Sequence, residues 1–303
     1  MRRTASILTI ATMVLSVTSL PSIAFTQAAT VTASSTIAVA PQYDTTHVYV
    51  APAKVDAFVA SFLGTFGGTS TKQVVTTVTP TPSLTSSQLL QTPVGTVSAF
   101  GFRTPIPTPF GSERTGYLVT DMNAAIEKAK ATGAAVVVTP FPDPIGLDAV
   151  IQWPGGVMTQ IYWHTTKPSY APFVTVPENR VYVSPDDVEK FMRSFLAFSG
   201  GRVVSDETAA PGAEIGLPEI TFRRLRVASN FGKMTIFVTD RRLPFPHGSE
   251  TTGYEVADLD STLKKATSLG AKLLVPSTPI ENRISAIVQF PGGYIAEIHS
   301  VAP

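Results

Sequence analysis

The sequence predicts an α+β fold made of two similar domains in tandem, each built from two modules with the element order βαβββ. The segment that begins at Gly111 returns without a gap at Gly248. A second segment begins at His47 and returns at Arg180. Within each copy, apolar residues recur first at strand spacing and then at helix spacing, and this sets the order of the elements.

The composition provides enough apolar residues for two hydrophobic cores, and it excludes several kinds of chemistry. The chain has 303 residues, of which 44% are hydrophobic, which is enough for two domains. Its net charge of +1 provides no basic field, so nucleic acid is not an expected partner. Because the chain has no cysteine, disulfides, thiolate catalysis and cysteine-ligated zinc are excluded.

Residues 1–24 are expected to be a secretory signal peptide. A basic start is followed by an apolar stretch, 7–20, that is short for a membrane span. Small residues at Ser22 and Ala24 then form a cleavage site. The alternative is a retained membrane anchor. We therefore expect a secreted or periplasmic protein with no stable membrane span after cleavage, and the sequence does not define its oligomeric state.

Two segments are expected to lie outside the domains. Residues 25–43 are small, polar and aperiodic, which is typical of a flexible leader. Residues 165–177 are rich in proline and are expected to be the linker between the domains. The first domain is then 44–164 and the second is 178–303.

Each domain is expected to open with a strand and a helix. Residues 47–50 alternate polar with apolar side chains, as do residues 180–183. Apolar residues then recur at helical spacing in both copies, and the glycine pairs beginning at Gly67 and Gly200 are placed to end these helices. Further strand-like runs lie within 69–103 and 202–239.

The second module of each domain repeats the order. Asp121 and Asp258 are placed to cap a helix, and Gly133 and Gly270 to end it. The strands expected after these helices are 134–138, 149–153 and 158–164 in the first domain, and 271–275, 286–290 and 295–299 in the second. The result is mostly antiparallel sheet with helices on one face.

The face of each sheet that carries no helix is expected to curl into a cup. Alternation along the strands assigns side chains to this face. Those expected in the first cup are His47, Tyr49, Gln160, Tyr162 and His164. Those expected in the second cup are Arg180, Tyr182, Glu297 and His299. Because so many polar side chains converge, the two cups are the candidate functional sites.

This pattern resembles the vicinal oxygen chelate superfamily, which includes glyoxalases, bleomycin-resistance proteins and extradiol dioxygenases. The resemblance rests on the opening H-V-Y-V strand, the V-x-D-x-(N/D) turn, the helix ending in Gly-Ala and the Q-x-P-G-G turn. It covers both domains and implies a small-molecule ligand. The fold hosts lyases, isomerases, oxidoreductases and plain binding proteins, so it does not define a reaction.

The resemblance implies metal ligands on the opening strands of both halves and on the last strand of a domain. In the first domain His47 and Gln160 fall at two of these positions, although Gln160 replaces the usual glutamate, and Arg114 lies near the third. His164 is a further donor. A catalytic metal needs at least three protein ligands. The expected cofactor is therefore either none or one divalent metal ion on His47 and Gln160.

In the second domain the same positions hold Arg180, Thr251 and Glu297, which also lack a full ligand set. We interpret Arg180 as an ion-pair partner of Glu297 that replaces the charge of a metal. Glu297 is then the candidate base of this cup, with His299 close by.

For His47 the sequence leaves two roles open. It is either a metal ligand or general base, or a residue at the cup edge that hydrogen-bonds Gln160. We interpret the cup tyrosines as wall aromatics because a phenol titrates near 10. The sequence thus predicts an exported glyoxalase-like protein that binds or transforms a small oxygen-bearing molecule. The alternative is a non-catalytic binding or sequestering protein with a degenerate metal site.

Overall fold

A computed structural model describes residues 36–42, 46–77, 83–105, 114–166, 173–239 and 250–301 of the chain. The expected signal peptide and the first part of the expected leader lie outside these residues. Within the described part of the chain, no helix has the length and apolar character needed to cross a membrane.

The first sheet is built from nine strands that precede residue 165. They are β1 (Thr46–Tyr49), β2 (Thr69–Ser70), β3 (Val74–Thr77), β4 (Leu84–Thr92), β5 (Gly95–Phe102), β6 (Arg114–Leu118), β7 (Ala135–Asp143), β8 (Gly146–Gln152) and β9 (Met158–His164). Their order is β2-β4-β5-β1-β6-β9-β8-β7, and β3 pairs with β4. The helices of this half are η1 (Pro52–Lys54), α1 (Val55–Phe66) and α2 (Met122–Ala131).

The second sheet repeats this plan with eight strands. They are β10 (Glu178–Val183), β11 (Arg202–Pro211), β12 (Thr221–Ser229), β13 (Gly232–Val238), β14 (Glu250–Glu255), β15 (Lys272–Ile280), β16 (Arg283–Gln289) and β17 (Ile295–Val301). Their order is β11-β12-β13-β10-β14-β17-β16-β15. The helices are α3 (Val188–Ser199), η2 (Gly212–Ile215) and α4 (Leu259–Ser268).

The predicted α+β fold of tandem βαβββ modules is confirmed. In each module the opening strand runs parallel to the last one, as β1 does to β5 and β10 does to β13. The remaining pairs are antiparallel, including β1 with β6 and β10 with β14, which join the two modules of a sheet. The two halves of one domain therefore share a sheet with each other.

The helix ends follow from local chemistry at the predicted residues. The Asp121 carboxylate accepts a hydrogen bond from the Ala124 amide at 2.7 Å, and Asp258 accepts one from Ser261 at 2.9 Å. Helix α3 ends at Gly200, whose φ of 65° is left-handed and favours glycine.

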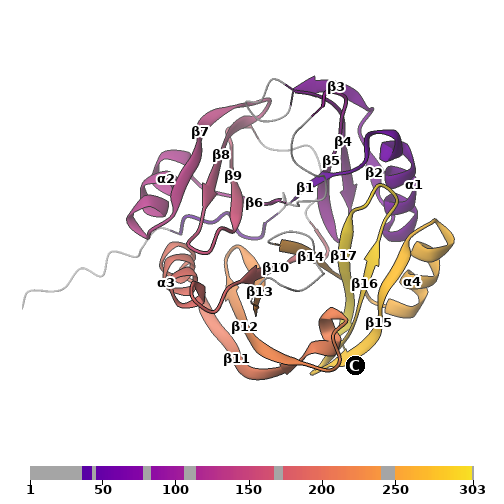
Figure 1. The fold of residues 1–303 in the computed structure, drawn as a ribbon. Coiled ribbons are helices and arrows are strands. Elements are labelled where there is room, and N and C mark those ends of the chain that lie inside the picture. The colour runs from indigo at the N-terminus through magenta and orange to yellow at the C-terminus, as the bar shows by residue number, and fades with distance from the viewer. Residues whose placement is uncertain are drawn as a thin grey trace, which may run out of the picture. The chain divides into compact units, whose positions relative to one another are not determined.

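The hydrophobic cores, unlike the sheets, are shared between the two halves of the chain. One core combines side chains of α2, β8 and β9 with those of α3, β12 and β13. The other combines α1, β4 and β5 with α4, β16 and β17. Figure 1 accordingly shows α1 beside α4 and α2 beside α3, and these helix pairs are in contact. Each core thus takes one module from each sheet, and the faces that carry no α-helix remain as the two cups.

Residues 36–42, which were expected to belong to the flexible leader, pack against the end of β6. Ala38 is buried and forms an antiparallel bridge with Val119. The Gln42 side chain donates to the Leu118 carbonyl at 2.9 Å and accepts from the Leu118 amide at 2.7 Å. This segment therefore satisfies backbone groups that the end of β6 would otherwise leave without partners.

Candidate functional site: two unlike cups

The first cup is formed by the helix-free face of the first sheet. Val48 and Ile161 point into the cores, so their neighbours on β1 and β9 point the other way. This places the predicted residues His47 and Tyr49 on β1, and Gln160, Tyr162 and His164 on β9, all on the cup face. Strand β6 lies between β1 and β9.

The floor of the first cup holds a buried amide and a carboxylate. Gln160 is fully buried, and its Nε2 donates a hydrogen bond to Asp148 Oδ2 at 2.8 Å. Asp148 lies on β8, directly opposite Tyr162 of β9. Asp148 was not among the residues predicted from the sequence, although a lone charge next to an apolar strand was a usable signal. The predicted bond between His47 and Gln160 stays a prediction.

Aromatic rings form the wall of the first cup. Tyr49 stacks on Phe102, with ring centroids 5.6 Å apart, and both rings are partly exposed. The His47 ring lies edge-on to Phe100 at 4.9 Å and to Tyr162 at 6.0 Å. A Cβ at Gly116 of β6 would lie 1.7 Å from the Tyr162 ring, so this glycine lets Tyr162 cross β6 toward His47.

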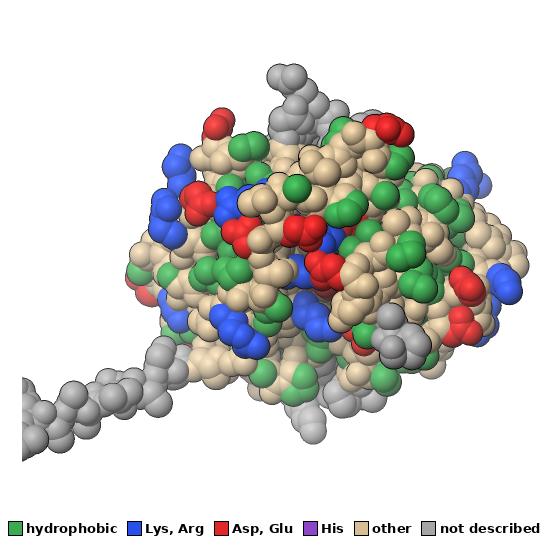
Figure 2. Space-filling view, turned by 90° about the horizontal axis from the view of Figure 1, so that it is seen from below, with side chains coloured by type: hydrophobic (Ala, Val, Ile, Leu, Met, Phe, Trp, Pro, Cys, Tyr) green, Lys and Arg blue, Asp and Glu red, His purple; other side chains and the backbone are tan. Residues whose placement is uncertain are grey.

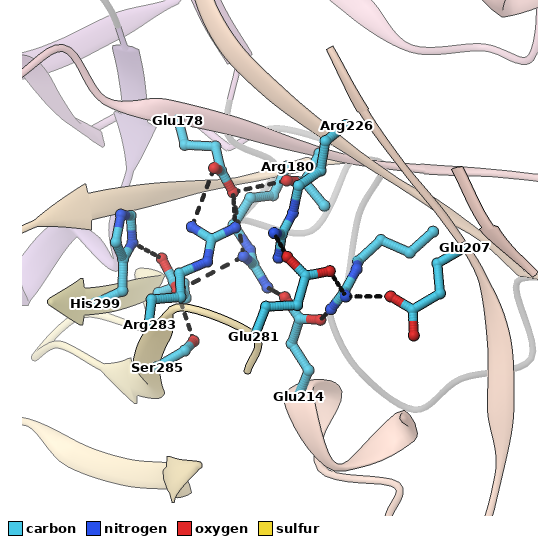
Figure 3. A network of polar contacts seen from close by, with 12 residues as sticks. Glu178, Arg180, Glu207, Glu214, Arg226, Glu281, Arg283, Ser285 and His299 are labelled. Carbon is cyan, nitrogen blue, oxygen red and sulfur yellow. Dashed lines mark hydrogen bonds and ion pairs between the residues drawn. The ribbon is translucent and has the colours of Figure 1, made fainter. Parts of the chain in front are cut away.

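The second cup is occupied by a network of ion pairs centred on Arg180 (Figure 3). Arg180 is 0% exposed, and its guanidinium lies 3.4 Å from Glu178, 3.3 Å from Glu214 and 3.6 Å from Glu297. Its Cζ also lies 4.7 Å from the centre of the Phe237 ring. Burial would lower the pKa of Arg180, but Glu297 and Glu214 raise it above its ordinary value.

Glu297 is held as an ionised anchor inside this network. It accepts a hydrogen bond from Ser285 Oγ at 2.5 Å, and its Oε2 lies 2.8 Å from His299 Nδ1. Burial would raise the pKa of Glu297, but Arg180 and His299 outweigh it and lower the pKa. Because the Ser285 hydroxyl donates its hydrogen bond to the Glu297 carboxylate, Ser285 is not arranged as a nucleophile with a histidine base.

Glu178 plays a similar part on the opposite side of Arg180. It pairs with Arg283 at 3.1 Å and accepts a hydrogen bond from Thr235 Oγ1 at 2.8 Å. Burial would raise the pKa of Glu178, but Arg283 and Arg180 hold it well below its ordinary value. Tyr182 stacks on Phe237 at 4.9 Å, and burial raises its pKa to about 12, so it acts as a wall side chain.

The outer part of the network was not predicted from the sequence. Arg224 pairs with Glu214, and its Nη2 lies 2.6 Å from Glu207 and 2.6 Å from Glu281. Glu281 also pairs with Arg226. These residues come from β11, η2, β12 and the turn between β15 and β16, so only the curled sheet brings them together.

Neither cup has a donor set that fits a catalytic metal. Among the residues that the structure describes, no three His, Asp or Glu side chains are grouped to hold an ion. In the first cup the Tyr162 ring crosses between the strands of His47 and Gln160. In the second, the Arg180 guanidinium takes the position beside Glu297, and a cation there would be repelled. The metal ligands implied by the resemblance are therefore not assembled in the described chain.

The fold is that of the vicinal oxygen chelate superfamily, as comparison with solved structures shows. 4-Hydroxymandelate synthase from Streptomyces coelicolor (a triple variant) is 14% identical, with a TM-score of 0.62 over 87% of this chain and 94% of that chain. 2,2',3-Trihydroxybiphenyl 1,2-dioxygenase from Sphingomonas wittichii strain RW1 is 14% identical, with a TM-score of 0.56 over 86% and 91%.

A third similar structure is the Mn(II)-bound glyoxalase from Novosphingobium aromaticivorans. It is 11% identical, with a TM-score of 0.54 over 88% of this chain and 83% of that chain. No family model matches the sequence, and no curated protein matches it significantly. The comparisons therefore establish the fold, and the function is inferred from the chemistry of the two cups.

Proposed function

We propose that this chain is an exported binding protein that holds a small, hydroxylated, planar organic molecule in its first cup without a catalytic metal. The observation that carries the proposal is the pairing of an aromatic wall with a polar floor. Tyr49 and Phe102 form a stacked, partly exposed wall, and His47, Asp148 and Gln160 supply hydrogen-bonding groups beside it.

The chemistry of the wall favours a planar ligand. A ring can stack in an offset or edge-to-face manner on Tyr49, Phe100 or Phe102. Ligand hydroxyl groups can donate to the Asp148 carboxylate or exchange hydrogen bonds with the His47 imidazole. Two of the similar structures are named for hydroxylated aromatic compounds, which is consistent with this class.

Binding is favoured over metal-assisted catalysis because of the donor sets. Gln160 replaces a charged ligand, and its amide is held by Asp148. Arg180 brings a fixed positive charge to the corresponding place in the second cup. Export is supported by the basic start and the short apolar stretch 7–20 of the sequence.

Calorimetric titration of the full chain with catechol and with 4-hydroxymandelate tests the proposal. We expect saturable binding that weakens about tenfold or more in His47→Ala and in Gln160→Ala, since each loses a polar contact of about 1.4 kcal/mol. Glu127→Gln on the exposed side of α2 is the control and should bind as the wild type does. Failure of both compounds to bind, or unchanged binding in the two cup variants, would refute it.

Metal analysis separates binding from metal-assisted catalysis. We expect no stoichiometric Mn, Fe, Co, Ni or Zn after loading and desalting of the full chain. One ion per chain that is lost in His47→Ala would replace the binding proposal with a chelate mechanism in the first cup.

A further inference from the structure

The outer part of the second cup contains an arginine with an unused edge. Arg226 lies on β12, and its side chain is 15% exposed. Its Nη1 pairs with Glu281, but its Nε and Nη2 are buried and have no hydrogen-bond partner among the described residues. The Nε–Nη2 edge of a guanidinium is one of the two edges that bind a carboxylate through parallel hydrogen bonds. An arginine in this state therefore lacks an anionic partner on one side.

Glu281 occupies this region from an unusual backbone position. It lies in the two-residue turn between β15 and β16, and its φ of 53° makes it the one non-glycine residue with positive φ in the described chain. This left-handed conformation is unfavourable for a glutamate, because its Cβ comes too close to the following carbonyl oxygen. The Glu281 carboxylate bridges Arg224 and Arg226 on β12 (Figure 3). It therefore links the β15–β16 turn at one edge of the sheet to β12 near the opposite edge.

The bridge formed by Glu281 differs from the rest of the network in its exposure. The Glu281 side chain is 40% exposed, whereas the side chains of Glu178, Glu214 and Glu297 are 5% exposed or less. Figure 2 shows acidic and basic side chains meeting near the middle of the face seen from below. Glu281 is thus a carboxylate at the rim that can leave without opening the buried ion pairs.

We infer that Arg224 and Arg226 form a binding site for the carboxylate group of a small organic acid, and that Glu281 fills this site in the free protein. An incoming carboxylate replaces one carboxylate by another, so the charge balance of the cup is kept. It also gains the Nε–Nη2 edge of Arg226, which Glu281 leaves unused. The site is separate from the first cup, and its test does not depend on the function proposed there.

The electrostatics of Arg226 support an anion at this position. Burial lowers the pKa of Arg226, and the neighbouring Arg283 and Arg224 lower it further, while Glu281 opposes them. Three guanidinium groups therefore lie close enough to repel one another. A second carboxylate oxygen on Arg226 reduces this repulsion.

Substitution of Glu281 by alanine, followed by chemical rescue, tests the inference. In Glu281→Ala we expect acetate and benzoate to raise the melting temperature saturably, relative to equal concentrations of chloride. Calorimetry should show benzoate binding about tenfold or more tighter to Glu281→Ala than to the wild type, because the internal competitor is gone. The double variant Glu281→Ala/Arg226→Met should lose both effects.

Glu207→Ala is the matched control. Glu207 also pairs with Arg224, and its side chain is 38% exposed. Among the described residues, it forms no ion pair with Arg226. We expect no saturable rescue by acetate in this variant. Equal rescue in both single variants, or rescue that survives Arg226→Met, would show that the carboxylate acts through general ionic effects and would overturn the inference.

Two further arms complete the test. Inorganic phosphate that stabilises Glu281→Ala while acetate and benzoate do not would overturn the assignment to carboxylates. If Glu281→Ala fails to fold, benzoate titration of the wild type against Arg226→Met decides instead. Binding that is lost in Arg226→Met supports the site, and equal or absent binding in both proteins contradicts it.

Discussion

The two cups of this molecule are built on the same scaffold and filled in opposite ways. The first has partly exposed aromatic rings above a buried amide–carboxylate pair. The second is filled by its own arginine and glutamate side chains, with Arg180 fully buried at the centre. The difference shows that one scaffold can carry two unlike cup interiors. A neutral amide bonded to a carboxylate lies in one cup, and a buried guanidinium surrounded by carboxylates lies in the other.

The largest expected effect concerns whether the two cups can exist apart. A fragment of residues 36–166 keeps the whole first sheet but loses half of each core. We expect it to lack a cooperative thermal transition by circular dichroism, because the helix faces of α1 and α2 would be exposed. A mixture with a fragment of residues 173–303 should regain part of the transition. A fragment that melts cooperatively alone would show that the cups belong to independent domains.

Removal of the central charge of the second cup should have the next largest effect. Arg180→Ala leaves three buried carboxylates without their shared partner, and we expect the free energy of unfolding in urea to fall by about 3–5 kcal/mol. His47→Ala at the corresponding position of the first cup should cost about 1–2 kcal/mol. Arg180→Lys keeps the positive charge, so its loss of unfolding free energy should lie between those of Arg180→Ala and His47→Ala if the wild-type network is electrostatic. Equal losses in the two alanine variants would contradict the difference between the cups.

Acid should weaken the second cup selectively. Glu178 and Glu297 have pKa values below those of unfolded glutamate, so the unfolded chain binds more protons in this range. Their stabilisation is complete above the unfolded pKa of about 4.3 and is lost as the pH falls through the lower folded values. We expect the free energy of unfolding to decrease below about pH 4.3, with a shallower decrease in Glu297→Gln. An identical pH profile for this variant would exclude Glu297 as a contributor.

The smallest expected effect tests the scaffold that the cups share. Asp121→Ala and Asp258→Ala each remove a helix cap with the same geometry. We expect each to lower the free energy of unfolding by about 1 kcal/mol, and by the same amount within error. Asp121→Asn and Asp258→Asn are the controls, since asparagine also caps helices. Unequal losses would mean that the two halves differ in their scaffold as well as in their cups.

The sequence predicted the scaffold well because each of its signals is local. Helix caps, terminal glycines and period-two alternation all depend on residues a few positions apart, as at Asp121 and Gly200. The cup faces of β1 and β9 followed from the same alternation.

The outer network of the second cup could not be predicted in the same way. The pairing of β11 with β12 has two irregularities, and each shifts the alternation of side chains between the two faces of the sheet. Period-two alternation along β11 therefore does not tell which face carries Glu207. Glu214 comes from the short helix η2, and Glu281 from a turn, where no period applies. Asp148 was missed because the strand expected at 149–153 starts three residues after the observed start of β8 at Gly146.

The sharing of the cores has a consequence for how a duplicated chain can diverge. A substitution on a helix-facing residue changes a surface where both copies meet, so each copy limits what the other can accept. A substitution in a cup changes the contacts of mainly one copy. Duplication followed by drift would then keep the two scaffolds alike and let the two binding surfaces become chemically independent, and His47 and Arg180, at matching places on β1 and β10, differ in this way.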